Sequence, residues 1–349
     1  MRTSSSGRLG MIAAVAGAVM ALTSGVGAAA PGGLAGGCSP IQTLSSGSSY
    51  ACAATGELLD VRIGDVLATQ PSLGYDEVYY KLGRYTLGKD EVNKKFDDWC
   101  EANGQVSAAS VKPGATLSDR SSFSCKVAVG QETAASIAAM KTVVIGPGGK
   151  PYLTDGHHTL TSFMETPGEA GADLHVRLKV LGNLSNLAEG EFWDTMKAKG
   201  WVWLKDVSGN PVSVDQLPKA LGLSNFADDN YRSMMYFTRD IGYKVGDLPF
   251  QEFYWGDWMR DNNVGAGWNR NDFASYIAAV RTVSQAQVAV GPDTVVSNGK
   301  TAKELGVLAA WNDGKAADSG EFAKLALPYS DAKPGKVAYA VEYRVRNGR

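Results

Sequence analysis

The sequence contains little histidine and cysteine, and almost no excess of charge of either sign. Its 349 residues include three histidines, His157, His158 and His175, so any imidazole chemistry must use one of these positions. Lys and Arg number 34 against 36 Asp and Glu, which argues against a protein that depends on bulk DNA contact, because such binding normally needs a basic face. With 44% hydrophobic and 20% charged residues, the composition is typical of a folded chain rather than a disordered one.

The first 30 residues have the layout of a secretory signal peptide. Two arginines precede an apolar run over residues 9–26, and three alanines at 28–30 provide small residues for a peptidase. The run is rich in Gly and Ala and lacks a basic stop-transfer flank, which favours cleavage over a membrane anchor. We therefore expect a mature chain that begins near Pro31, contains no transmembrane segment and is secreted, to the periplasm or outside the cell.

Four cysteines follow this segment, at Cys38, Cys52, Cys100 and Cys125. An even number after a secretion signal predicts structural disulfides, for which three pairings exist. The lower entropic cost of closing short loops favours Cys38–Cys52 and Cys100–Cys125. No C-x-x-C spacing is present, so the sequence offers no basis for a redox or zinc motif.

Composition and periodicity divide the rest of the chain into four parts. Residues 31–56 are rich in Gly and Ser and nearly uncharged, as in a tether. Helix and strand patterns alternate over residues 57–205, and residues 206–282 are predicted to be helical and rich in aromatic side chains. Residues 283–349 form a mixed C-terminal segment that ends on an expected strand, Val337–Val345.

One part of the helical region concentrates aromatic residues. Phe250, Phe253, Tyr254 and Trp258 fall at helical spacing behind Pro249, a good first-turn residue. We interpret Phe250, Phe253 and Trp258 as one buried stripe, and a stacking platform for bases is the alternative. The surrounding stretch carries more acidic than basic residues, which would repel a polyanion and therefore favours packing.

A hairpin pattern precedes the only two adjacent histidines. Residues 131–141 have helical spacing, residues 142–145 form a β-branched strand, and a Gly-rich turn at 146–149 leads to a returning strand at 151–153. Farther along, residues 174–181 alternate apolar and polar side chains, which predicts a half-buried strand with a basic second face.

The segment Asp155-Gly156-His157-His158 then opens a predicted helix. We expect Asp155 to cap this helix and Gly156 to adopt a positive φ or to allow close backbone approach. The first-turn amides would hold phosphoryl oxygens while a histidine moves a proton, which is the chemistry of phosphate esters. The alternative is a capped helix with two surface histidines. Whether a divalent metal binds Asp155, His157 and His158 stays open, since adjacent ligands converge only with strain.

These segments resemble the ParB/sulfiredoxin superfamily, and specifically its branch of ParB-like nucleases, which shares an Asp-Gly-His-His motif after a β-hairpin. The resemblance runs from Leu58 to Asp261 and includes Thr69-Gln70-Pro71, residues 229–233 (DNYRS) and residues 252–255 (EFYW). It implies an α+β fold: a small mixed β-sheet with flanking helices, of the ParB/sulfiredoxin type, here followed by the helical aromatic-rich subdomain. It also implies a cleft at the Gly-His-His turn.

Relatives use that cleft for phosphorylated or nucleotide ligands, as nucleases, nucleotide-driven switches, free-serine kinases or sulfinic acid reductases. The paired arginines of the ParB nucleotide box and the Gly-Cys-His-Arg turn of sulfiredoxins are absent here, because Gly156 is followed by His157-His158-Thr159. A secreted protein would also meet little ATP or CTP. Both points weaken the switch and kinase interpretations.

Several residues are candidate partners of the histidine pair. Lys81, Arg177 and Gln70 are candidate phosphate or ligand contacts, together with Gly156. Glu77 or Asp76 is a candidate carboxylate base, although two acids in an expected loop are usually solvated.

Three functions follow from these residues. The first is a secreted nuclease or phosphodiesterase that acts on phosphate esters through the Asp-Gly-His-His turn, with a nucleic acid or another phosphate-containing ligand as its partner. The second is a non-catalytic envelope protein that binds an anion or nucleotide, and the third is a phosphotransferase similar to the free-serine kinases. The sequence identifies no cofactor, and a divalent metal is compatible with the first function.

Overall fold

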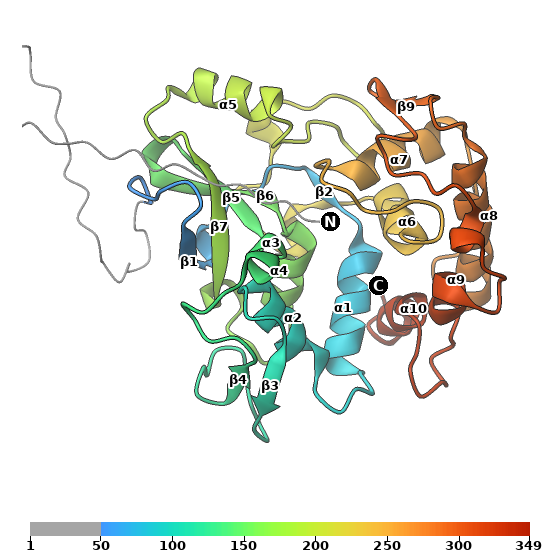
Figure 1. The fold of residues 1–349 in the computed structure, drawn as a ribbon, viewed down its shortest axis with the longest axis horizontal. Helices are drawn as coiled ribbons and strands as arrows, with labels where there is room; N and C mark the ends of the chain where they lie inside the picture. The colour runs from blue at the N-terminus through green and yellow to red at the C-terminus, as the bar shows by residue number, and fades with distance from the viewer. Residues whose placement is uncertain (1–49) are drawn as a thin grey trace, which may run out of the picture. The chain divides into compact units, whose positions relative to one another are not determined.

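A four-stranded mixed sheet forms the centre of the N-terminal half in the computed structural model, which describes residues 50–349 (Figure 1). The strand order is β1 (Leu58–Arg62), β7 (His175–Asn183), β5 (Thr142–Gly146) and β6 (Lys150–Asp155). β7 pairs antiparallel with β1 and parallel with β5, and β5 pairs antiparallel with β6. The predicted signal peptide, most of the predicted tether and Cys38 lie outside the described residues.

The predicted hairpin is confirmed. Val143 lies opposite Leu153, and the turn between the strands contains Gly148 with a φ of 72°. β7 alternates as expected, since Val176, Leu178 and Val180 are buried. The helix expected over residues 131–141 is shorter, because α3 spans only Ala134–Ala138.

Helices cover both faces of this sheet. Val143 and Ile145 belong to a large core shared with α1 (Tyr75–Thr86) and α4 (His157–Met164), whereas Val144 packs in a smaller cluster with Phe192 and Met196 of α5 (Glu189–Ala198). Because successive strand residues point to opposite faces, one β-branched run supplies both cores. The fold class predicted from sequence, a small mixed sheet with flanking helices, is confirmed.

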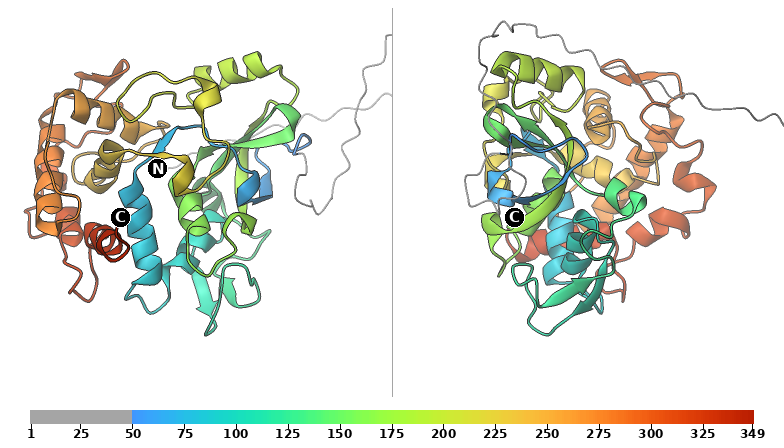
Figure 2. Two further views of the ribbon diagram at one scale, coloured as in Figure 1. Left: turned by 180° about the vertical axis from the view of Figure 1, so that it is seen from behind. Right: turned by 60° about the vertical axis from the view of Figure 1, so that its left-hand side comes forward.

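The C-terminal half is mainly helical. Its helices are α6 (Asn230–Thr238), α7 (Gln251–Asp261), α8 (Phe273–Ala289), α9 (Gly320–Leu325) and α10 (Lys336–Arg346). Short strands accompany them: β8 (Ala227–Asp228) pairs in parallel with β2 (Ser72–Leu73), and β9 (Val295–Ser297) pairs with β10 (Lys300–Thr301). α10 packs along α1, as the two views of Figure 2 show.

The strand expected at Val337–Val345 is wrong, because this segment lies within α10. The β-branched and aromatic residues suggested a strand, but Val337, Ala340 and Val341 recur at helical spacing and are buried. Packing of this face against α1 outweighs the local strand propensity.

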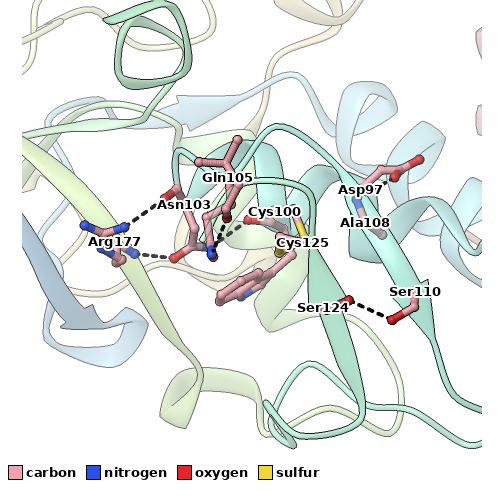
Figure 3. Close-up of a disulfide and its surroundings, with 11 residues drawn as sticks. Asp97, Cys100, Asn103, Gln105, Ala108, Ser110, Ser124, Cys125 and Arg177 are labelled. Carbon is pink, nitrogen blue, oxygen red and sulfur yellow. Dashed lines mark hydrogen bonds between the residues drawn. A yellow bond between two sulfur atoms is a disulfide. The ribbon is translucent and has the colours of Figure 1, made fainter. Parts of the chain in front are cut away.

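A disulfide attaches a small hairpin to the helical layer. Cys100 of α2 (Lys94–Ala102) bonds Cys125 of β4 (Phe123–Cys125), which pairs with β3 (Ala108–Val111), as Figure 3 shows. The predicted Cys100–Cys125 pairing is therefore confirmed, whereas the Cys38–Cys52 pairing involves a residue outside the described part. Within residues 50–349, each helix is too short or too polar to cross a membrane.

Candidate functional site

A cleft of about 550 Å³ lies at the start of α4. The ends of β5 and β6, the adjoining parts of α6 and α7, and the loop at residues 245–250 contribute to its wall. The cleft therefore combines the motif that the sequence singled out with segments from the helical half of the chain.

Gly156 shapes the backbone at the entrance to α4. It is the N-cap of the helix, with a φ of 108°, and a Cβ at this position would approach the Lys141 side chain to 2.6 Å. The predicted positive φ is confirmed. The predicted cap by Asp155 is wrong, because Gly156 itself takes the N-cap position and no side chain caps the helix. Asp155 is instead exposed, 3.4 Å from Lys141 Nζ.

His157 links α4 to the segment before β2. Its side chain is 2% exposed, and Nε2 accepts a hydrogen bond from the Thr69 amide at 3.2 Å. Burial, and to a smaller extent the nearby Arg232 guanidinium, lowers the pKa of His157 to about 3 against the opposing effect of Asp155. The ring is therefore neutral at physiological pH, with its proton on Nδ1.

His158 makes the corresponding link one residue farther on. It is 7% exposed, and Nε2 accepts from the Gly74 amide at 3.0 Å. Burial and the Arg232 guanidinium hold its pKa well below the usual value, so Nδ1 carries the proton, 3.8 Å from Glu77 Oε2. The alternative of two surface histidines is wrong, since both rings are buried and both line the cleft.

A buried cluster of two carboxylates and two guanidiniums lies beside the histidines. Arg232 Nη2 lies 3.1 Å from Glu77 Oε2 and 3.8 Å from Glu252 Oε2, and Arg239 contacts Glu252. Burial raises the pKa of Glu77, but Arg232 and Arg239 outweigh this effect and hold it below the ordinary value. The same balance lowers the pKa of Glu252, so both carboxylates are ionised at neutral pH.

Arg232 has hydrogen-bond donors without partners. The residue is 4% exposed, yet neither Nε nor Nη1 has a hydrogen-bond partner among residues 50–349. Nε of the neighbouring Arg239 is likewise unpartnered there. A buried charged donor that lacks an acceptor costs considerable free energy, so such groups are normally paired. Arg232 and Arg239 both contribute to the lining of the cleft, although these unpaired nitrogens are themselves buried.

The structure brings only some of the sequence-predicted residues to this cleft. Its lining includes six of them: Gln70, Glu77, Asp155, Gly156, His157 and His158. Gln70 Nε2 already donates to the Ser72 carbonyl.

Three other candidates lie outside the cleft lining. Lys81 pairs with Asp98, and Arg177 pairs with Glu132. Asp76 is buried within an ion-pair network with Arg270 and Arg344, from the C-terminal part of the chain. The expectation that Asp76 and Glu77 are solvated loop residues is wrong, because both lie in the first turn of α1 and are buried.

Sequence reasoning missed Arg232, Arg239 and Glu252 as site residues. A signal for two of them was present, because Arg232 and Glu252 lie in the runs 229–233 and 252–255 that carry the family resemblance. No comparable signal marked Arg239, whose position depends on how the chain turns after α6.

The predicted aromatic helix is confirmed, but its aromatic side chains lie in two different environments. Trp258 belongs to the main core, whereas Phe250 and Phe253 line the cleft. Phe253 stacks on Trp203 with ring centroids 5.1 Å apart. Phe253 and Trp258 are five residues apart, which is about 140° around a helix, so a single stripe cannot contain both.

Among residues 50–349, no group of three or more His, Cys, Asp or Glu side chains is arranged to hold a metal ion. Asp155 diverges from the two histidines, because its carboxylate is exposed while both rings turn inward.

Comparison with known proteins identifies the family of the chain. The family described as "Putative ParB-like nuclease" matches residues 59–261, more than half of the chain. This chain belongs to the ParB-like nuclease family. Both adjacent histidines and all four members of the buried charged cluster lie within the matched residues.

Comparison with curated proteins finds no match. Among solved structures, the chain is similar to protein Atu1540 from Agrobacterium tumefaciens, with 21% sequence identity and a TM-score of 0.45. That similarity covers 66% of this chain and 90% of the other.

Proposed function

We propose that this protein is a secreted phosphodiesterase or nuclease that binds a phosphate ester in the cleft, with Arg232 as its principal phosphate contact. The observation that carries the proposal is the buried Arg232 guanidinium with unpartnered Nε and Nη1 donors. A planar guanidinium presents paired donors that match phosphate oxygens. A phosphoryl group that reaches the guanidinium would satisfy a donor that the protein itself leaves unpaired.

The start of α4 supplies the second part of the anion site. The first amides of a helix have no intrahelical partner, and the helix dipole favours negative charge there. Gly156 at a φ of 108° carries no side chain that would obstruct this end of the helix. His157 and His158 fix the position of α4 through bonds to the Thr69 and Gly74 amides.

Glu77 is the proposed acceptor of the proton from an attacking water. Nε2 of each cleft histidine already accepts a backbone hydrogen bond, and both pKa values are low. Glu77 is ionised and lies 3.8 Å from the protonated Nδ1 of His158. The proposal therefore assigns proton transfer to the Glu77 carboxylate and not to the imidazoles that the motif suggested. His158 serves as a positioning residue.

Secretion is part of the proposal. The signal-peptide pattern of residues 1–30 supports it, as does the Cys100–Cys125 disulfide, because disulfides persist mainly in oxidising compartments. The alternative of a non-catalytic anion-binding protein is favoured by one observation, namely that both imidazoles are already occupied by backbone donors.

Hydrolysis of bis(p-nitrophenyl) phosphate by purified mature protein tests the proposal. We expect Arg232→Gln to weaken inorganic phosphate binding at least tenfold, measured by calorimetry. Glu77→Gln should lower kcat by ~10²–10⁴ and leave phosphate affinity nearly unchanged. Arg177→Gln is the matched control, since Arg177 is also part of a largely buried ion pair but lies outside the cleft lining.

Two outcomes would contradict the proposal. Wild-type protein that binds phosphate but hydrolyses the ester no faster than Glu77→Gln would support the anion-binding alternative. Phosphate binding that is unchanged in Arg232→Gln and lost in Arg177→Gln would place the anion site elsewhere. Each assay is run with and without EDTA and with added Mg²⁺, which measures any dependence on a divalent metal.

A further inference from the structure

We infer that the cleft selects a small phosphate ester with one anionic end and a neutral or cationic remainder, and rejects the internal phosphates of a nucleic-acid strand. This inference rests on the proposed function, because it assumes that the phosphoryl group binds at Arg232. It specifies the substrate class of that same site.

The distribution of charge in the cleft is the first observation. The cations Arg232 and Arg239 belong to the buried cluster, where Glu77 and Glu252 accompany them. The exposed part of the lining is acidic and includes Glu101 and two aspartates, Asp155 and Asp247.

Among residues 50–349, one cation of the lining lies outside the buried cluster. It is Lys141, and Asp155 already pairs with it. A ligand therefore meets negative charge at the rim before it reaches the guanidinium donors below.

This arrangement disfavours a polyanion. Each strand of a nucleic acid carries one charge for every ~3.4 Å of its length, so a strand with one phosphate at Arg232 would bring its neighbouring phosphates against the acidic rim. A protein that binds such a strand normally neutralises several phosphates with Lys and Arg. The whole chain offers no compensating excess, since its formal net charge is −2.

The apolar wall of the cleft gives the remainder of the ligand a place to bind. Phe250 and Phe253 line it together with Trp201. Phe250 has a φ of 58°, a conformation that bulky residues rarely adopt. An aromatic face binds a flat neutral ring or a cation and gains nothing from an anion. The volume of about 550 Å³ is within the range of small-ligand pockets.

A charge-neutralising variant of the rim tests the inference. Neither Glu101 nor Asp247 makes a side-chain hydrogen bond or ion pair within residues 50–349, so Glu101→Gln/Asp247→Asn removes charge without breaking such an interaction there. The matched control is Asp293→Asn/Asp318→Asn, which changes the net charge equally at exposed positions outside the cleft lining.

The two substrates are bis(p-nitrophenyl) phosphate and an oligothymidylate of ten nucleotides. We expect wild-type kcat/KM to be at least tenfold higher for the small ester. The rim variant should raise kcat/KM for the oligonucleotide about three- to tenfold and change that for the small ester by less than twofold. The control variant should change neither. Raising NaCl from 50 to 200 mM should increase oligonucleotide hydrolysis, since salt screens repulsion.

Opposite results would overturn the inference and leave the proposed function intact. One is a wild-type preference for the oligonucleotide. The other is a rate of oligonucleotide hydrolysis that falls steeply with salt, as the nucleic-acid affinity of phosphate-neutralising proteins does. If no ester is hydrolysed, the proposed function fails. Titration of tryptophan fluorescence with phenyl phosphate and with the oligonucleotide then still tests whether the acidic rim rejects a polyanion. Equal affinities of the wild type and the rim variant for the oligonucleotide would overturn the inference.

Discussion

Gly156 combines two constraints that a substitution experiment can separate. Its φ is 108°, and a Cβ there would meet the Lys141 side chain, whereas Gly168 has a φ of 81° with open space around it. We expect Gly168→Ala to lower the free energy of unfolding by about 1 kcal/mol, and Gly156→Ala to lower it by about 2 kcal/mol because it adds a clash. Urea denaturation measures both. Equal losses would show that only backbone conformation matters at Gly156.

The buried histidines predict a dependence of stability on pH. The pKa of His157 is about 3 in the folded chain and near 6.5 when unfolded, and that of His158 is also lowered. Between pH 6.5 and 3 the unfolded state binds more protons, so stability is lost as the pH falls. Each ring contributes up to ~1.4 kcal/mol per pH unit in that window.

The measurement is the free energy of unfolding at pH 7, 6 and 5 for the wild type and for His157→Gln and His158→Gln. Glutamine retains an acceptor for the backbone amide but does not titrate. Each variant should show a shallower loss of stability with falling pH. A slope equal to that of the wild type would mean that the imidazoles do not carry the effect.

At this scale the sequence identified six of the residues that line the cleft. The Asp-Gly-His-His motif and Glu77 were recognised because they belong to one short pattern or to the region that resembles the family. Lys81 and Arg177 were candidate ligand contacts but do not line the cleft. A basic side chain on a polar face has nearby carboxylates as competing partners: Asp98 binds Lys81, and Glu132 binds Arg177. Such pairing depends on tertiary contacts that no local pattern encodes.

Among the helices, α1 is the element that joins the cleft to the C-terminal part of the chain. Asp76 accepts hydrogen bonds from Arg270 Nε at 2.8 Å, from Arg344 Nη1 at 2.9 Å and from the Tyr276 hydroxyl at 2.7 Å. All three donors lie beyond the family match, which ends at residue 261. Since Glu77 is the next residue, this network holds the N-terminal turn of α1 in place.

Asp76→Asn should therefore be strongly destabilising. Removing one charge from a buried ion-pair network leaves the other charges uncompensated and typically costs ~3–5 kcal/mol. Asp194→Asn, at an exposed pair with Lys197, should change the free energy of unfolding by less than ~1 kcal/mol. Chemical denaturation compares the two variants. A small loss for Asp76→Asn would mean that the arginines find other acceptors.

Element types were predicted best where the sequence period was unambiguous. The hairpin at β5 and β6, the strand β7 and the helix α7 were all correct in type. α10 was wrong because its β-branched and aromatic residues favour a strand locally, and its contact with α1 could not be known from sequence. The prediction that Asp76 and Glu77 are exposed was wrong for the same reason, because their partners are far along the chain.

For the whole molecule, the family resemblance predicted the α+β class and the small mixed sheet. The boundaries proposed at residues 205 and 282 stay predictions. One hydrophobic core contains side chains from Tyr50 to Val341, including residues from each of the four predicted parts. A continuous core of this kind arises from contacts between distant segments, and periodicity within one segment carries no information about them.

The disulfide also acts at the scale of the whole molecule, because it closes a loop of 25 residues between α2 and β4. Closing such a loop restricts the unfolded chain, so Cys100→Ser/Cys125→Ser should lower the free energy of unfolding by about 3 kcal/mol. Phosphate binding well below the melting temperature should persist, since neither cysteine lines the cleft. Thiol titration of denatured, unreduced mature protein should find no reactive group. Four reactive thiols would contradict both the pairing and the oxidising compartment that it supports.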